Sequence, residues 1–105
     1  MTWRIFIESS LFSRLIENYL DDDQYGELQR YLIKHPTVGD IVPKSGGVRK
    51  LRWKIAGRGK RGGIRVIYYL KGKTTIYLLT VYSKGEVSNI SAKVLRQIKE
   101  ALTND

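Results

Sequence analysis

The sequence predicts a small α+β domain in which helices cover a twisted antiparallel sheet. Three observations predict it: an alternating strand pattern near the N-terminus, two amphipathic helical patterns after it, and three successive strand patterns before a last helix. The expected order is strand, helix, helix, strand, strand, strand, helix. With 105 residues, of which 42% are hydrophobic, we expect one domain, residues 1–105, around one modest core.

The first half of the chain carries clear helix boundaries. Residues 3–8 alternate as a strand, and Ser9 or Ser10 can cap the helix whose apolar stripe runs from residue 11 to residue 20. The aspartates at 21–23 suit the first turn of a second helix, because the positive end of the helix dipole favours carboxylates. We interpret them as a cap rather than as metal ligands, since no second acidic cluster accompanies them. His35, the only histidine, precedes the helix-ending Pro36 and is interpreted as a partner of the helix dipole.

The second half predicts a meander of three strands. Residues 37–47 are expected to be a loop, and residues 64–70 and 75–82 are strands joined by a hairpin at residues 71–73. Residues 48–55 alternate, so that Leu51, Trp53 and Ile55 can face the core while the opposite face carries three cations, Lys50, Arg52 and Lys54. Ser91 opens the last helix, whose apolar positions are Val94, Leu95, Ile98 and Leu102.

Positive charge is concentrated in the middle of the chain. From Ile41 to Gly85 there are twelve Lys or Arg residues and no Asp or Glu, whereas the other residues hold seven basic and ten acidic side chains. The formal charge of +9 therefore comes entirely from this middle segment. A local excess of this kind attracts phosphate, although a solvated charged face is the plain alternative.

Several other classes of function find no support in the sequence. There is no cysteine for a disulfide or a thiolate zinc site, no apolar run long enough to span a membrane, and no secretory signal pattern, so we expect a cytoplasmic protein. Residues 57–62 match the letters GxGxxG, but a strand rather than a helix follows, and the first later carboxylate is Glu86. A dinucleotide site is therefore rejected.

The basic segment favours binding or cleavage of nucleic acid. For binding alone, cations and stacking aromatics suffice, with Trp53, Tyr69, Tyr77 and Tyr82 as candidates, most of which are also core positions. For RNA cleavage the 2′-hydroxyl can attack the phosphate itself, and the segment offers neither His nor carboxylate for proton transfer. A cationic cluster disfavours the protonated form of a lysine and favours the ionised form of a tyrosine, whereas arginine stays charged and can hold phosphate. The proton-transfer candidates are Lys54, Lys60, Lys84 and Tyr82, with Arg58, Arg61 and Arg65 as stabilisers and no required metal or cofactor.

The stretch GVRKLRWKIAGRGKRGGIRVIYYLKGKTTIYLLTVYSKGE resembles the HigB branch of the RelE/ParE superfamily of bacterial toxins. The resemblance implies a RelE-like fold and a ribosome-dependent mRNA interferase that cuts the message in the A site through 2′-hydroxyl attack. It also implies a HigA-like antitoxin with a helix-turn-helix. The toxin would contact operator DNA only through this antitoxin.

The resemblance also assigns roles to residues. Arg65 matches the arginine that contacts the scissile phosphate in this family. Lys84 matches a basic residue that follows the last strand, and Tyr82 matches the aromatic position of a Y-x-K pattern. Lys60 and Arg61 join these as candidate catalytic residues, and the expected RNA- or ribosome-binding residues are Arg49, Lys50, Arg52, Lys54 and Arg58. Two alternatives stay open: a ParE-like inhibitor of DNA gyrase without nuclease activity, and a non-catalytic module that binds RNA or the ribosome.

Overall fold

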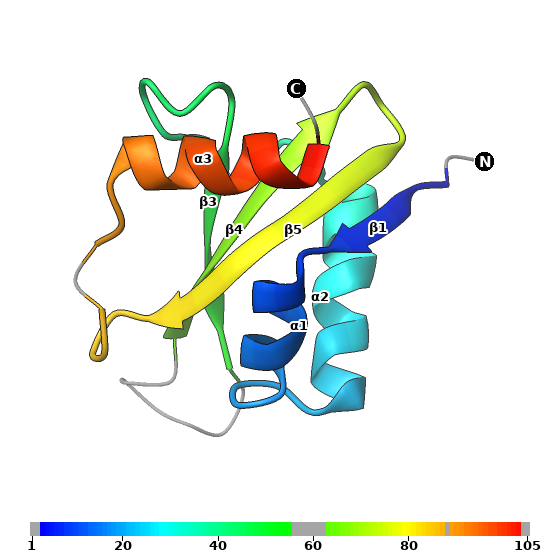
Figure 1. Cartoon of the computed structure of the whole chain (residues 1–105). Coiled ribbons are helices and arrows are strands. Elements are labelled where there is room, and N and C mark those ends of the chain that lie inside the picture. The colour runs from blue at the N-terminus through cyan, green and yellow to red at the C-terminus, as the bar shows by residue number, and fades with distance from the viewer. Residues whose placement is uncertain (1–2, 56–62, 88, 104–105) are drawn as a thin grey trace.

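The computed structural model describes residues 3–55, 63–87 and 89–103. Its elements, in chain order, are β1 (Ile5–Glu8), α1 (Ser10–Ile16), α2 (Asp22–Lys34), β2 (Asp40–Ile41), β3 (Arg49–Lys54), β4 (Gly63–Lys71), β5 (Thr75–Ser83) and α3 (Ala92–Thr103). The strands form one sheet in the order β1-β5-β4-β3-β2. Figure 1 shows α3 crossing β3, β4 and β5 on one face of this sheet, away from α2.

The α+β prediction is confirmed, but two details of the sheet are wrong. β1 pairs with β5 in parallel, so the sheet is mixed rather than wholly antiparallel. Alternation along a strand is the same for either direction of pairing, and this is why the sequence did not reveal it. The segment predicted as a loop contains the short edge strand β2, which pairs antiparallel with β3.

The helix boundaries follow from local hydrogen bonds. Ser9 caps α1, because its hydroxyl accepts a hydrogen bond from the backbone N–H of Phe12 at 2.9 Å. Asp21 and Gln24 form a capping box at the start of α2, with bonds of 2.8 and 2.9 Å. The Ser91 hydroxyl accepts from the backbone N–H of Val94 at 3.2 Å, ahead of α3. These caps confirm the three predicted helix starts.

The two faces of the sheet are covered by different helices. Helices α1 and α2 pack on one face in a cluster that includes Phe12, Leu28, Leu32, Val66 and Leu78. Helix α3 packs on the other face over a smaller cluster of five buried residues, Val48, Ile67, Leu79, Tyr82 and Leu95. Val94, one of the apolar positions predicted for the last helix, is 42% exposed and lies outside this cluster.

A buried cation helps to fix α3 on its face. Lys99 is 8% exposed, and its ammonium group donates to the backbone oxygen of Gly46 at 3.2 Å. The same Nζ atom lies 4.7 Å from the centre of the Tyr69 ring. None of the helices in the described part of the chain is long and apolar enough to cross a bilayer.

Candidate functional site

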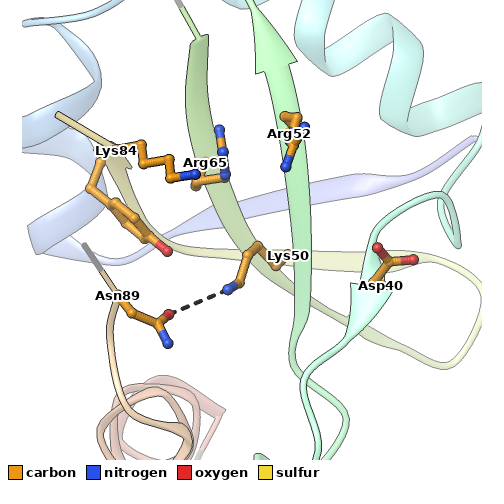
Figure 2. Close-up of a pocket in the computed structure, with 7 residues that line it drawn as sticks. Asp40, Lys50, Arg52, Arg65, Lys84 and Asn89 are labelled. Atoms are coloured by element: carbon orange, nitrogen blue, oxygen red, sulfur yellow. Dashed lines mark hydrogen bonds between the residues drawn. The ribbon is translucent and has the colours of Figure 1, made fainter. Parts of the chain in front are cut away.

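A concave pocket of about 340 Å³ opens on the α3 face of the sheet. Figure 2 shows that Lys84, Arg65, Arg52 and Lys50 gather in it, with Asn89 on one side and Asp40 on another. The pocket draws on four strands and on the segments after β5. Its lining residues are Asp40, Lys50, Arg52, Arg65, Tyr82, Lys84 and Asn89.

Strand pairing explains why these side chains meet. Arg65 of β4 pairs with Arg52 of β3 on one side and with Tyr82 of β5 on the other. Directly opposed residues of neighbouring strands point to the same face, so these three side chains form a row across the sheet. Lys50 lies two residues before Arg52 on the same face of β3, and it pairs with Asp40 of β2.

A bulge in β5 is needed to bring Tyr82 to this face. Ile67 pairs with Thr80 and Tyr68 pairs with Leu78, so Leu79 is the extra residue between them. One extra residue reverses the alternation of a strand. Tyr77, before the bulge, and Tyr82, after it, therefore both pack against the α3 side, whereas a regular strand would put them on opposite faces.

The pocket carries a strongly positive field. Its lining contains four cationic side chains and one carboxylate, and a concave surface with one dominant sign of charge concentrates the opposite ion. The Nζ atom of Lys50 is 3.3 Å from Oδ1 of Asn89, which also accepts from the backbone N–H of Ile90 at 3.0 Å. The arginine and lysine groups suit a phosphate, because guanidinium and ammonium groups donate charge-assisted hydrogen bonds to its oxygens.

Tyr82 is buried beside these cations, with only 5% of its surface exposed. Burial raises the pKa of its phenol above the ordinary value, and the positive charge of Arg65 lowers it by a smaller amount. The expectation that the positive field makes this tyrosine easier to ionise is therefore wrong in its net direction. At neutral pH the phenol keeps its proton and can donate it.

The structure brings together five of the predicted site residues: Lys50, Arg52, Arg65, Tyr82 and Lys84 all line the pocket. Lys54 continues the cationic face of β3 and pairs with Gly63, but it does not line this pocket. Arg58, Lys60 and Arg61 lie outside the described residues.

Arg49 was expected to bind RNA or the ribosome, and its side chain makes contacts away from the pocket. Its guanidinium group donates to the backbone oxygens of Thr37 at 3.0 Å and Gly39 at 2.8 Å. His35 is also remote from the pocket: it caps the C-terminus of α2, and its ring centre lies 5.0 Å from that of Tyr31. Trp53 packs against the core cluster under α1 and α2, as its alternation predicted.

Sequence reasoning missed two pocket residues, Asp40 and Asn89. Asp40 is the last acidic residue before the basic segment, but only the pairing of β2 with β3 brings it to the site. A two-residue strand shows no alternation, so the sequence holds no periodic signal for it. Asn89 lies in the connection to α3, where the pattern predicted only a helix start.

A second groove, of about 430 Å³, adjoins the pocket and shares Asp40, Lys50 and Asn89 with it. It continues between β2 and the start of α3, where its walls are mainly apolar. The residues that line this extension are Ile41, Val42, Pro43, Ile90, Ser91 and Ala92. The described residues contain no group of three or more His, Cys, Asp or Glu side chains that could hold a metal ion.

Comparison with known proteins gives the family. Residues 33–104 match the family described as the RelE toxin of the RelE / RelB toxin-antitoxin system. This chain belongs to the RelE toxin family. Membership places it in a toxin–antitoxin system and implies a cognate antitoxin as its partner.

The fold agrees with this family. The chain is similar to the structure of an arginine-substituted mutant of the E. coli toxin RelE in the free state, with a TM-score of 0.55. The alignment covers 94% of this chain and 98% of that one, at 11% sequence identity. At this level of identity the likeness establishes the RelE-like fold, and the chemistry of the site must be argued from the pocket itself.

Proposed function

We propose that this RelE-family chain belongs to the HigB branch and is a ribosome-dependent endoribonuclease that cleaves mRNA in the A site. The observation that supports this most is that Arg65, Tyr82 and Lys84 line one concave, cationic pocket. A site that only bound the RNA backbone would need the cations alone. A buried, protonated phenol among them can supply the proton that the leaving 5′-oxygen takes up.

In the proposed reaction the 2′-hydroxyl oxygen attacks the adjacent phosphorus and the bond from phosphorus to the 5′-oxygen breaks. The products are a 2′,3′-cyclic phosphate and a new 5′-hydroxyl. Arg65 and Arg52 hold the non-bridging oxygens, where negative charge develops in the transition state. Tyr82 donates the proton that the leaving 5′-oxygen takes up, and Lys84 stabilises the charge beside it.

Other cations hold the message in place around this centre. Lys50 at the pocket, and Lys54 further along β3, are suited to neighbouring phosphates of a single strand. The basic segment of the sequence also contains Arg58, Lys60 and Arg61. We assign Lys60 and Arg61 to cleavage and Arg58 to RNA binding. Arg49 is not given a role in RNA binding, because its guanidinium group is used within the fold.

We further propose a HigA-like antitoxin with a helix-turn-helix as the partner, and contact with operator DNA only through that antitoxin. In the bacterial cytoplasm the antitoxin would hold the toxin inactive. The test is co-expression: a helix-turn-helix protein encoded beside this chain should co-purify with it and abolish its toxicity.

The nuclease proposal is tested by inducing the chain in bacteria and mapping new 5′ ends on translated messages. Cleavage within codons, and its loss when translation initiation is blocked, would support the proposal. Intact messages with inhibited DNA supercoiling would favour a ParE-like gyrase inhibitor instead. Ribosome association with neither effect would leave a binding module.

A further inference from the structure

The proposed reaction still needs an acceptor for the proton of the attacking 2′-hydroxyl. Tyr82 keeps its own proton at neutral pH, so it suits the opposite role of donor. Among the described residues, the pocket lining contains one carboxylate, that of Asp40. A carboxylate is an ordinary proton acceptor in such reactions.

The carboxylate of Asp40 is available for this role. It is exposed, and it makes no hydrogen bond or ion pair with any described side chain. The ammonium group of Lys50, its partner across the strands, is directed to Asn89 instead. The nearest acidic residue after β5, Glu86, already accepts from Tyr19 at 3.0 Å and Ser83 at 2.9 Å and does not line the pocket.

The backbone that carries Asp40 is held from the opposite face of the sheet. The buried hydroxyl of Tyr68 accepts from the N–H of Gly39 at 2.9 Å and donates to the oxygen of Pro36 at 2.8 Å. Arg49 donates to the oxygen of Gly39 at 2.8 Å. A side chain at position 39 would meet the Tyr68 ring at 2.9 Å, so only glycine fits against these groups. Asp40 therefore projects from an anchored strand.

Its position also suits the geometry of the reaction. Figure 2 shows Asp40 on one side of the pocket and Lys84 on the other, with Arg52 and Arg65 between them. In a displacement at phosphorus, the attacking and leaving oxygens lie in line on opposite sides of the phosphate. Tyr82 on β5 also lies across Arg52 and Arg65 from β2, the strand that carries Asp40. A phosphate held by the two arginines would therefore have the carboxylate on one side and the phenol of Tyr82 on the other.

We propose that Asp40 is the general base of this site, an inference that rests on the proposed nuclease function. The carboxylate takes the proton of the 2′-hydroxyl as its oxygen bonds to phosphorus. On the far side, the bond from phosphorus to the 5′-oxygen breaks and that oxygen takes the phenolic proton of Tyr82. The proton lost by the nucleophile thus resides on Asp40, and the phenolate is neutralised by proton exchange with water after the products leave.

The test uses ribosomes programmed with a synthetic message that carries one scissile linkage, with either oxygen or sulfur at the bridging 5′ position. A thiolate leaves without being protonated, so sulfur removes the need for the proton donor but not for the base. Asp40→Asn should slow single-turnover cleavage about 10²- to 10⁴-fold on both messages. Tyr82→Phe should be slow on the oxygen message and regain most of its rate on the sulfur message.

Two controls separate a chemical role from a structural or binding role. Asp22→Asn changes an exposed aspartate in the first turn of α2, away from the pocket, and should cleave both messages as the wild type does. A message with a 2′-deoxy sugar at the scissile position cannot be cut, and Asp40→Asn should bind it on the ribosome at least as tightly as the wild type, because a negative charge has been removed near the phosphates.

Three results would overturn the inference. Wild-type rates for Asp40→Asn would show that the carboxylate accepts no proton. Rescue of Asp40→Asn by sulfur would assign it to the leaving group instead. Weaker binding of the 2′-deoxy message, in proportion to the lost rate, would make it a binding residue. If the wild type cuts neither message, the nuclease proposal itself fails, and with it the role of Asp40.

Discussion

The two faces of the sheet are built for different purposes. The face under α1 and α2 is mainly apolar and encloses fully buried side chains such as Phe12 and Leu28. The face under α3 changes character part-way along each strand: on β4, Ile67 lies in the α3 cluster, and Arg65, two residues earlier, lines the open pocket. Stability and charge are therefore separated in space, so the pocket can be altered without dismantling the core.

The largest expected effect is on stability, from the apolar face. Phe12→Ala empties a fully buried site under α1 and should lower the free energy of unfolding by about 3–5 kcal/mol. Urea denaturation followed by tryptophan fluorescence measures this. Val94→Ala on the exposed side of α3 is the matched control and should cost about 0.5 kcal/mol or less. A loss below about 1 kcal/mol for Phe12→Ala would contradict the division of roles.

The next effect is on activity, from the cationic face. Arg65→Ala should reduce cleavage on the ribosome by about 10²-fold or more, because it removes charge stabilisation at the phosphate. Its melting temperature should stay within a few degrees of the wild type. Arg14→Ala, which removes an exposed cation from α1, is the control and should retain full activity. Undiminished toxicity of Arg65→Ala would remove this arginine from the mechanism.

A smaller effect is expected where the two faces are connected. Tyr68→Phe leaves the N–H of Gly39 and the oxygen of Pro36 without their partner, at a cost of about 1–3 kcal/mol in the free energy of unfolding. Because these bonds hold the backbone next to Asp40, cleavage should slow as well. Tyr77→Phe removes a half-buried hydroxyl from the other face for comparison. Equal stability of the two variants would mean that the Tyr68 hydroxyl does not anchor this segment.

The most gradual effect is the response to alkali. Burial raises the pKa of Tyr19, Tyr25, Tyr68 and Tyr82, so the unfolded chain loses these phenolic protons at a lower pH than the folded chain. This contribution to stability is complete below about pH 10 and is lost as the pH rises through the folded pKa values. Unfolding free energies from urea titrations at pH 8 to 11 should therefore be flat and then fall. Tyr25→Phe should make the fall less steep, and an unchanged slope would argue against this cause.

The sequence predicted what depends on local pattern. Alternation placed Lys50 and Arg52 on one face of β3, and the caps at Ser9 and Asp21 were read from residue type and position. It could not predict what depends on pairing between distant segments. The parallel direction of β1 and the arrival of Asp40 at the site are both set by partners far along the chain.

The protonation of Tyr82 was also beyond sequence reasoning. The sequence shows the cations near Tyr82, and the positive charge of Arg65 does lower the pKa of this phenol, as expected. The burial that outweighs them is a property of the packed fold, in which Tyr82 joins the α3 cluster. The sign of such a shift depends on a competition between desolvation and charge, and only the packed structure fixes the first of these.

The extra residue in β5 makes this strand tolerant of a change in length. Deleting Leu79 in frame would remove the bulge, and the pairs Ile67–Thr80 and Tyr68–Leu78 would become consecutive in a regular ladder. Every later side chain of the strand would keep its face, so the phenol at position 82 would stay in the pocket. The loss of one residue at this point thus removes a buried side chain from the layer under α3 but leaves the row of site residues in register.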